Sequence, residues 1–298
     1  MKRPVFKAGR ALKAKKTFHP GDFAFKLIVY ILMTVFAVSF VFVMVWMVLN
    51  SFRTSFRFMQ DPLNFFDFAN WTGDNYVNAF TQEVGANNTT MLGMVLNSVI
   101  YIFPPLILQI FIPTIAGYIC AKFRFKGKTA IITMVIVSMT VPAVSSTLQT
   151  FRLISWMNLY DNFLGIYLMA AGGLGFGFLL YYNYFGGIPW EYAESAQLDG
   201  ASNLRIFLQI YMPMARPIIV AMFITGLIGR WNDFTTPFLY LPSSPTVANG
   251  IQIIFDFSGE DWPLMFASMT FTCVVSLVLY ALFSKQITES MSAGGLKA

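Results

Sequence analysis

The sequence predicts an all-α, polytopic membrane protein with six transmembrane helices. Of its 298 residues, 56% are hydrophobic and only 11% are charged, whereas soluble domains carry about 25% charged residues. The hydrophobic residues form continuous runs of about 20 residues, which is the length of a membrane-spanning helix. A transmembrane β-barrel would instead show segments of about ten residues that alternate between polar and apolar side chains. These observations exclude a soluble enzyme with a single membrane anchor.

Six apolar runs define the expected spans and divide the chain into three regions. A hydropathy window of about 19 residues places the spans at residues 27–50, 91–121, 129–150, 164–187, 218–241 and 264–284. We therefore expect a transmembrane domain over residues 27–284. A basic N-terminal tail of residues 1–26 precedes it, and a C-terminal tail of residues 285–298 follows it.

The distribution of basic residues predicts the orientation of these spans. Sixteen of the 20 Lys and Arg residues lie in the two tails and in the second–third and fourth–fifth connections, whereas Arg53, Arg57 and Arg152 lie in the opposite loops. Because Lys and Arg are retained on the cytoplasmic side, we expect both termini to be cytoplasmic. Basic segments beside anionic lipid then explain the formal net charge of +6, so that no nucleic-acid partner is needed.

The cytoplasmic connection over residues 188–217 has the pattern of an amphipathic helix–turn–helix. Glu191 and Glu194 lie where the dipole at the start of a helix favours acids. Gly200 can end this first helix, and Ser202 can cap a second one. The expected apolar face of the second helix carries Leu204, Phe207, Leu208 and Tyr211. Such an element can lie on lipid headgroups, brace the helix bundle or dock into a partner protein.

The same loop resembles the EAA motif of binding-protein-dependent ABC importer permeases. That motif consists of Glu-Ala-Ala, three residues, Gly, nine residues and Ile-x-Leu-Pro. At the same intervals this chain has Glu194-Ser195-Ala196, Gly200, Ile210 and Pro213. The departures are Ser195 and Met212, which replace Ala and Leu.

Further segments are similar to the carbohydrate branch of this family. They are Glu191, Asp199-Gly200-Ala201 and Trp231-Asn232-Asp233-Phe234. The Gly-containing C-terminal tail resembles that of the maltose-permease G-type subunits. The resemblance covers essentially the whole chain and implies the type I permease fold, with its core over residues 91–284.

The resemblance also implies how the loop works. In such importers its first helix sits in a groove on a cytosolic ATPase, and closure of the ATPase dimer on ATP drives alternating access. The residues that would carry this coupling are Glu191, Glu194, Ser195, Ala196, Asp199, Gly200 and Ala201.

The implied partners are a cytosolic ATPase dimer, a second permease that we expect to be non-identical, and an extracellular substrate-binding protein that delivers a sugar. The chain would lie in a bacterial cell membrane and catalyse no reaction itself. It would hold no cofactor or metal, because ATP and Mg²⁺ bind the partner ATPase. Gly127-Lys128-Thr129 looks like the end of a P-loop, but that pattern requires Gly at the position of Lys122.

Two charged residues, Arg230 and Asp233, fall within an expected span, three residues apart on one helix face. Ionisable groups in lipid are costly, so we expect both to face the bundle interior or a water-filled cavity. One interpretation is a polar patch for substrate hydroxyls, and the other is an internal salt bridge that fixes the fifth helix. The candidate residues of the substrate path are Arg230, Trp231, Asn232, Asp233 and Phe234.

Two other function classes compete with a sugar permease. A permease of the same fold could carry a peptide, a polyamine or phosphate, because the partner binding protein largely selects the ligand. An integral-membrane enzyme is disfavoured, because no cluster of His, Cys or paired carboxylates lies at one depth of the membrane.

Overall fold

The structure, a computed structural model, describes residues 20–64, 66, 68–85, 87–140 and 143–295. Most of the expected basic tail, residues 1–19, lies outside the described residues. Every element among the described residues is a helix, apart from an isolated bridge between Val84 and Thr89. The helices are α1 (Pro20–Asn50), α2 (Ser55–Gln60), η1 (Phe68–Asn70), α3 (Asp74–Thr81), α4 (Met91–Lys122), α5 (Lys128–Thr140), α6 (Ala143–Trp156), α7 (Phe163–Ala171), α8 (Gly175–Gly186), α9 (Glu191–Leu198), α10 (Asn203–Ile206), η2 (Phe207–Tyr211), α11 (Met212–Met214), α12 (Arg216–Trp231), α13 (Thr235–Tyr240), α14 (Val247–Phe257) and α15 (Trp262–Gly295).

The chain divides into two compact units, residues 1–48 and residues 49–298. The first unit contains most of α1, whose segment Ala24–Asn50 is long and apolar enough to cross a membrane. The second unit contains all the other helices, and the sites described below lie within it.

Three of the six expected spans are continuous helices. They are Ala24–Asn50, Met91–Lys122 and Trp262–Gln286. The fourth is a pair, α7 and α8, that bends by 40° around residues 172–174. The third corresponds to α5 and α6, and residues 141–142 between them lie outside the described part of the chain. The expected C-terminal tail begins as a continuation of α15, which runs to Gly295.

The fifth expected span, residues 218–241, is not one helix. Helix α12 ends at Trp231, and α13 begins at Thr235. Pro237 has no N–H to pair with the carbonyl of Asp233, as a continuous helix would require. The Asp233 carboxylate instead accepts a hydrogen bond from the backbone N–H of Thr236, at 3.0 Å. Asp233 therefore lies in a break between two helices rather than on one helix face with Arg230.

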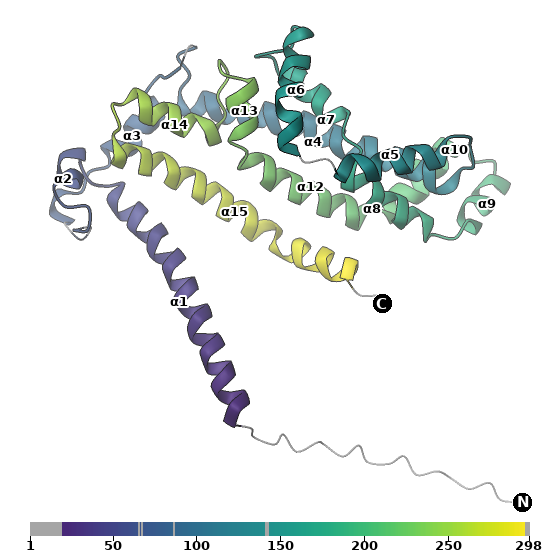
Figure 1. Cartoon of the computed structure of the whole chain (residues 1–298), viewed down its shortest axis with the longest axis horizontal. Helices are drawn as coiled ribbons and strands as arrows, with labels where there is room; N and C mark the ends of the chain where they lie inside the picture. The colour runs from purple at the N-terminus through teal and green to yellow at the C-terminus, as the bar shows by residue number, and fades with distance from the viewer. Residues whose placement is uncertain (1–19, 65, 67, 86, 141–142, 296–298) are drawn as a thin grey trace, which may run out of the picture. The chain divides into compact units, whose positions relative to one another are not determined.

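Helix α4 is the main packing element of the second unit, since α7, α8, α12 and α14 all contact it. Gly117 allows α4 to approach α8 closely, because a Cβ there would lie 2.8 Å from the Tyr181 Cβ and 3.0 Å from the Tyr182 backbone nitrogen. Helix α15 packs along α12 (Figure 1). This arrangement places α12 between α4 and α15.

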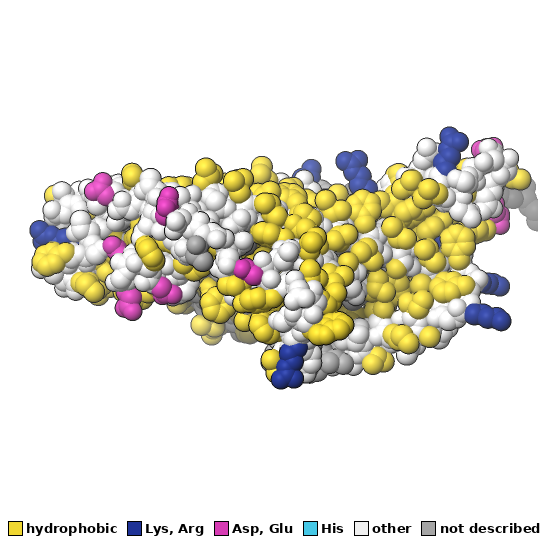
Figure 2. Space-filling view, turned by 90° about the horizontal axis from the view of Figure 1, so that it is seen from above, with side chains coloured by type: hydrophobic (Ala, Val, Ile, Leu, Met, Phe, Trp, Pro, Cys, Tyr) yellow, Lys and Arg dark blue, Asp and Glu magenta, His cyan; other side chains and the backbone are white. Residues whose placement is uncertain are grey.

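Charged side chains gather toward the two ends of the second unit (Figure 2). Hydrophobic side chains dominate the middle of the visible face, and Lys and Arg gather toward the end that carries α9 and α10. Most Asp and Glu side chains of this face lie toward the opposite end. An apolar band between two charged ends is the surface expected of a membrane-spanning bundle.

Candidate functional site

The loop over residues 188–217 forms the helix–turn–helix that its sequence predicts. Helix α9 ends at Leu198 with Asp199 as its C-cap, and Gly200 follows with φ of +79°, in the left-handed region that favours glycine. The Ser202 side chain then caps α10 by accepting a hydrogen bond from the Arg205 N–H at 3.4 Å. The turn is thus built from residue types suited to each backbone position.

Most of the predicted coupling residues are exposed on α9 and its turn. Within this helix Ala193 is fully buried and anchors one face to the bundle. The opposite face carries a large apolar side chain, Leu198, which is 90% exposed, and Tyr192, which is 51% exposed. The exposed predicted coupling residues are Glu191, Glu194, Ser195, Asp199 and Gly200, while Ala196 and Ala201 are half-buried. The exposed side of α9 therefore offers a partner both apolar side chains and the carboxylates of Glu191, Glu194 and Asp199.

The second helix of the loop presents a different face from the one predicted. Phe207 and Tyr211 are buried as expected, but Leu204 and Leu208 are largely exposed. The segment Phe207–Tyr211 forms a π-helical turn, in which the Met212 N–H bonds the carbonyl five residues back. A wider turn rotates the following side chains relative to α-helical spacing.

An aromatic cluster joins this loop to the transmembrane helices. The Tyr118 ring of α4 lies 4.7 Å from the Phe207 ring and 4.9 Å from the Tyr211 ring. Lys122, at the end of α4, donates a hydrogen bond to the Ile188 carbonyl and lies over the Tyr211 ring at 5.3 Å. Both flanks of α9 and its turn, at Ile188 and at Phe207–Tyr211, are therefore in direct contact with α4.

The chain bends by 70° between the segment Asn203–Met214 and α12. The Tyr184 hydroxyl of α8 donates a 2.5 Å hydrogen bond to the Met214 carbonyl at this bend. Tyr184 thus holds the bend between the loop and α12.

Arg230 and Asp233 are not joined by a salt bridge within the described residues. The Asp233 carboxylate accepts a 2.6 Å hydrogen bond from the Tyr101 hydroxyl, besides the bond from the Thr236 N–H. The Arg230 guanidinium donates to Gln109 Oε1 at 3.3 Å and lies over the Tyr101 ring at 5.7 Å. The internal salt bridge that the sequence left open is therefore absent here, and each charge has other partners.

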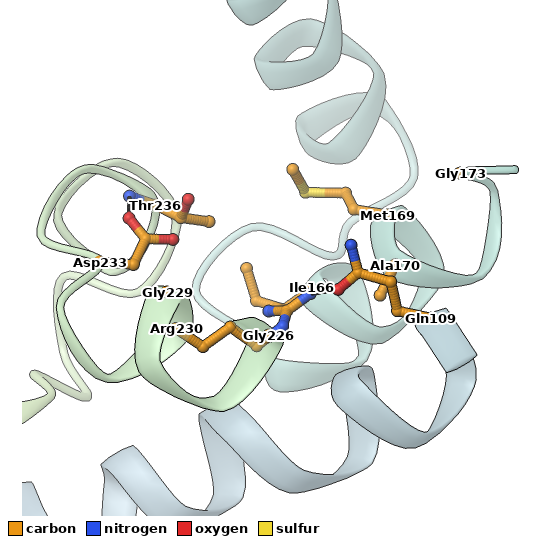
Figure 3. A pocket seen from close by; sticks show the side chains of 10 residues that line it. All are labelled: Gln109, Ile166, Met169, Ala170, Gly173, Gly226, Gly229, Arg230, Asp233 and Thr236. Carbon is orange, nitrogen blue, oxygen red and sulfur yellow. Dashed lines mark hydrogen bonds between the residues drawn. The ribbon is translucent and has the colours of Figure 1, made fainter. Parts of the chain in front are cut away.

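Both charged residues line a cavity of about 380 Å³ between α4, α7, α12 and α13 (Figure 3). The polar part of its wall consists of Gln109, Arg230, Asp233 and Thr236. The apolar part consists of Ile166, Met169 and Ala170, and Gly173, Gly226 and Gly229 bring backbone to the wall. A mainly apolar cavity with a few convergent polar groups is the usual form of a small-molecule site.

The other three candidates for the substrate path do not line this cavity. Trp231 is buried, and its indole N–H has no hydrogen-bond partner among the described residues. Asn232 donates to the Ile228 carbonyl at 2.9 Å, and the Phe234 ring stacks on Phe238 at 5.3 Å. The break after Trp231 therefore separates this run into residues that face different surroundings.

Sequence reasoning missed Tyr101, Gln109 and Thr236 as neighbours of the charged pair. Gln109 could have been identified from the sequence, because a polar amide in an apolar span is expected to hydrogen-bond inside the bundle. No group of three or more His, Cys, Asp or Glu side chains among the described residues could hold a metal. The groups that the cavity offers a ligand are therefore hydrogen-bond donors, hydrogen-bond acceptors and apolar surface.

Comparison with known families identifies a match over most of the transmembrane domain. The family described as binding-protein-dependent transport system inner membrane component matches residues 113–291. These residues include the loop and the cavity residues that α7, α12 and α13 contribute.

Similar proteins extend the match to nearly the whole chain. The permease protein NgcG of a diacetylchitobiose uptake system in Streptomyces coelicolor is 28% identical over 92% of this chain and 90% of its own length. The maltodextrin transport system permease protein MdxG of Bacillus subtilis is 26% identical over 91% of this chain and 96% of its own length. A solved bacterial ABC transporter involved in the import of the acidic polysaccharide alginate contains a chain with the same fold. The TM-score is 0.75 at 19% identity, over 91% of this chain and 99% of the other.

Proposed function

The chain belongs to the family of binding-protein-dependent transport system inner membrane components, and we propose that it carries a carbohydrate or oligosaccharide. It is a multi-pass membrane permease of an ABC importer and not the subunit that hydrolyses ATP. The observation that carries the proposed substrate is the similarity to sugar permeases over about nine-tenths of both chains. The cavity beside Arg230 and Asp233 supports it, because sugars need both hydrogen-bond donors and acceptors.

Helix α9 is the proposed coupling element. Its exposed Leu198 and its carboxylates would seat in a groove of a cytosolic ATPase that binds ATP and Mg²⁺. The left-handed Gly200 would let the two surfaces approach closely, since no atom of this chain lies near its missing side chain. Closure of the ATPase dimer would move α9 together with the segments that flank it, and the contacts of Tyr118 with Phe207 and of Lys122 with Ile188 would pass this movement to α4.

The charge distribution supports an orientation for this assembly. The end that carries α9 and the basic connections would face the cytoplasm of a bacterial cell, with both termini on that side. The more acidic end would then face outward and receive a substrate-binding protein. A second permease, expected to be non-identical, would complete the transmembrane pathway.

A peptide, polyamine or phosphate permease of the same fold is the competing function. A polyamine would meet Arg230, and a phosphate would meet Asp233, across the same cavity. Neither charge type suits a wall that carries both signs. The charges of the wall therefore argue against a polyamine and a phosphate, and the similarity to sugar permeases argues against a peptide.

Reconstitution with native partners tests this function. The chain is purified with its ATPase, sister permease and binding protein, and ATP hydrolysis and uptake are measured in liposomes. A panel of mono- and oligosaccharides is compared with oligopeptides, polyamines and phosphate. We expect at least one saccharide to be taken up and to stimulate ATP hydrolysis. Uptake restricted to a compound outside the saccharide panel would contradict the proposed substrate.

A further inference from the structure

Arg230 and Asp233 open onto one cavity without pairing, although opposite charges attract strongly where water is scarce. Each carboxylate oxygen of Asp233 has its own donor. The Tyr101 hydroxyl lies 2.6 Å from Oδ2, and the Thr236 N–H lies 3.0 Å from Oδ1. The carboxylate is thus turned toward α4 and α13.

Tyr101 contacts both charges at once. Its side chain is buried, with 1% of its surface exposed, so its position is fixed by packing in α4. Its hydroxyl bonds the Asp233 carboxylate, while its ring lies 5.7 Å from the guanidinium carbon of Arg230. Figure 3 shows the result: Arg230 extends toward Gln109, whereas the Asp233 carboxylate lies beside Thr236.

We propose that Tyr101 is a positioning residue that keeps Asp233 away from Arg230, so that the cavity offers both charges to the hydroxyl groups of an uncharged saccharide. The inference rests on the proposed function and narrows its substrate class. It assigns Tyr101 a role in transport, although Tyr101 does not line the cavity.

The hydrogen-bonding capacity of the two charges supports an uncharged ligand. A guanidinium has five N–H donors, and Arg230 uses one of them on Gln109. Its Nε is buried and has no partner among the described residues. A carboxylate has about four acceptor positions, of which Tyr101 and Thr236 occupy two.

A sugar hydroxyl can accept from Arg230 and donate to Asp233, because a hydroxyl is both an acceptor and a donor. An acidic sugar would gain attraction from Arg230 and suffer repulsion from Asp233. With the two charges held apart, the cavity matches neighbouring hydroxyl groups of a neutral ring.

A double-mutant cycle tests the positioning role. In Tyr101→Phe, the freed carboxylate should turn to Arg230 and occupy the guanidinium. We expect uptake per ATP hydrolysed to fall about ten-fold, the size of losing a hydrogen bond to a charged group. We expect Asp233→Asn by itself to transport poorly, and in this background Tyr101→Phe should cause no further loss, because no carboxylate remains to be positioned.

Tyr240→Phe is the matched control. Tyr240 is also buried and also donates a hydroxyl hydrogen bond, to the Thr147 carbonyl at 3.3 Å, but it does not touch either charge. Uptake by Tyr240→Phe should remain at the level of the unaltered chain. An equal loss in Tyr240→Phe, unchanged uptake in Tyr101→Phe, or an undiminished effect in the Asp233→Asn background would each overturn the positioning role.

A second variant decides the matter if Tyr101→Phe does not assemble. Gln109→Glu places a carboxylate beside Arg230 without altering Tyr101, and it should likewise occupy the guanidinium and lower uptake about ten-fold. Unchanged uptake in Gln109→Glu would contradict a role of the remaining Arg230 donors in binding the sugar, and with it the positioning role of Tyr101.

The charge of the substrate is tested with two probe sugars, neutral maltotriose and acidic trigalacturonate. Every variant of the chain is assayed with the same binding protein. We expect uptake of the neutral probe and a loss of that uptake in Tyr101→Phe. Transport of trigalacturonate alone would overturn the proposal that the substrate is uncharged, and it would leave the proposed function as a sugar permease in place. Transport of no saccharide across the wider panel would instead overturn the proposed function itself.

Discussion

At the scale of single residues, Gly200 is the position where backbone conformation and docking meet. Its φ of +79° is unfavourable for residues with a side chain, yet no atom lies within 4 Å of the Cβ that it lacks. The backbone conformation therefore favours glycine at this position, and the space beside Gly200 is open to a partner surface. The sequence predicts the turn here from Gly200 and Ser202, because their conformational preferences are local.

Two substitutions separate these requirements. Gly200→Asn should leave the free energy of unfolding nearly unchanged, because Asn tolerates the left-handed conformation, but its side chain should hold α9 away from the ATPase and reduce uptake. Gly200→Val should lose uptake and also destabilise the protein by about 1–2 kcal/mol. Thermal unfolding and uptake are measured together. Full uptake by Gly200→Asn would argue against close approach at this position.

The candidate substrate residues show where reasoning from the sequence stops. Charge within an apolar span predicts that Arg230 and Asp233 face the bundle interior or a water-filled cavity, and both line the cavity between α4, α7, α12 and α13. Their partners Tyr101 and Gln109 lie more than 100 positions away in the chain. Such pairings depend on how α4 packs against α12, which no local pattern specifies.

At the scale of helices, the approach of α4 to α8 depends on Gly117. A methyl group there would lie 2.8 Å from the Tyr181 Cβ, so Gly117→Ala should force the helices apart and destabilise the protein by about 1–3 kcal/mol. The measurement is thermal unfolding in detergent. Gly186→Ala in α8 is the control, because nothing lies within 4 Å of its Cβ position. Equal stability of the two variants would show that the contact is not tight.

The bend before α12 gives a second prediction at this scale. Tyr184→Phe removes the 2.5 Å hydrogen bond to the Met214 carbonyl, and losing one such bond costs about 1 kcal/mol. We expect a looser link between the loop and α12, which lowers uptake per ATP hydrolysed while ATP hydrolysis continues. Tyr182→Phe on the same helix should retain the normal ratio, because the Tyr182 hydroxyl makes no hydrogen bond within the described residues. A normal ratio in Tyr184→Phe would mean that the bend is held by other contacts.

Helix existence follows from the sequence more readily than helix boundaries. Composition and run length predict the long helices α1, α4 and α15, because each carries enough apolar residues to cross a bilayer. The break at Asp233 and the π-helical turn over Phe207–Tyr211 were not predicted. Both arise where side-chain capping or tertiary packing competes with a regular helix.

At the scale of the whole molecule, the predicted orientation can be tested by labelling. Asn78 and Asn203 are both exposed, one in α3 and the other at the start of α10. Single cysteines are introduced at these positions after Cys120 and Cys273 are replaced by alanine. An impermeant maleimide should label Asn78→Cys on intact cells and Asn203→Cys only after the membrane is opened. The reverse pattern would invert the orientation and move α9 away from any cytosolic ATPase.

A photocrosslinker placed at Leu198 tests whether α9 docks into a separate ATPase. Leu198 is 90% exposed, and Leu92, which is 64% exposed at the other end of the described bundle, serves as the matched position. After irradiation of the assembled complex, we predict an adduct with the mass of the ATPase subunit from position 198 and none from position 92. An adduct of the ATPase from both positions, or from position 92 alone, would contradict the account, as would the absence of any ATPase adduct at position 198.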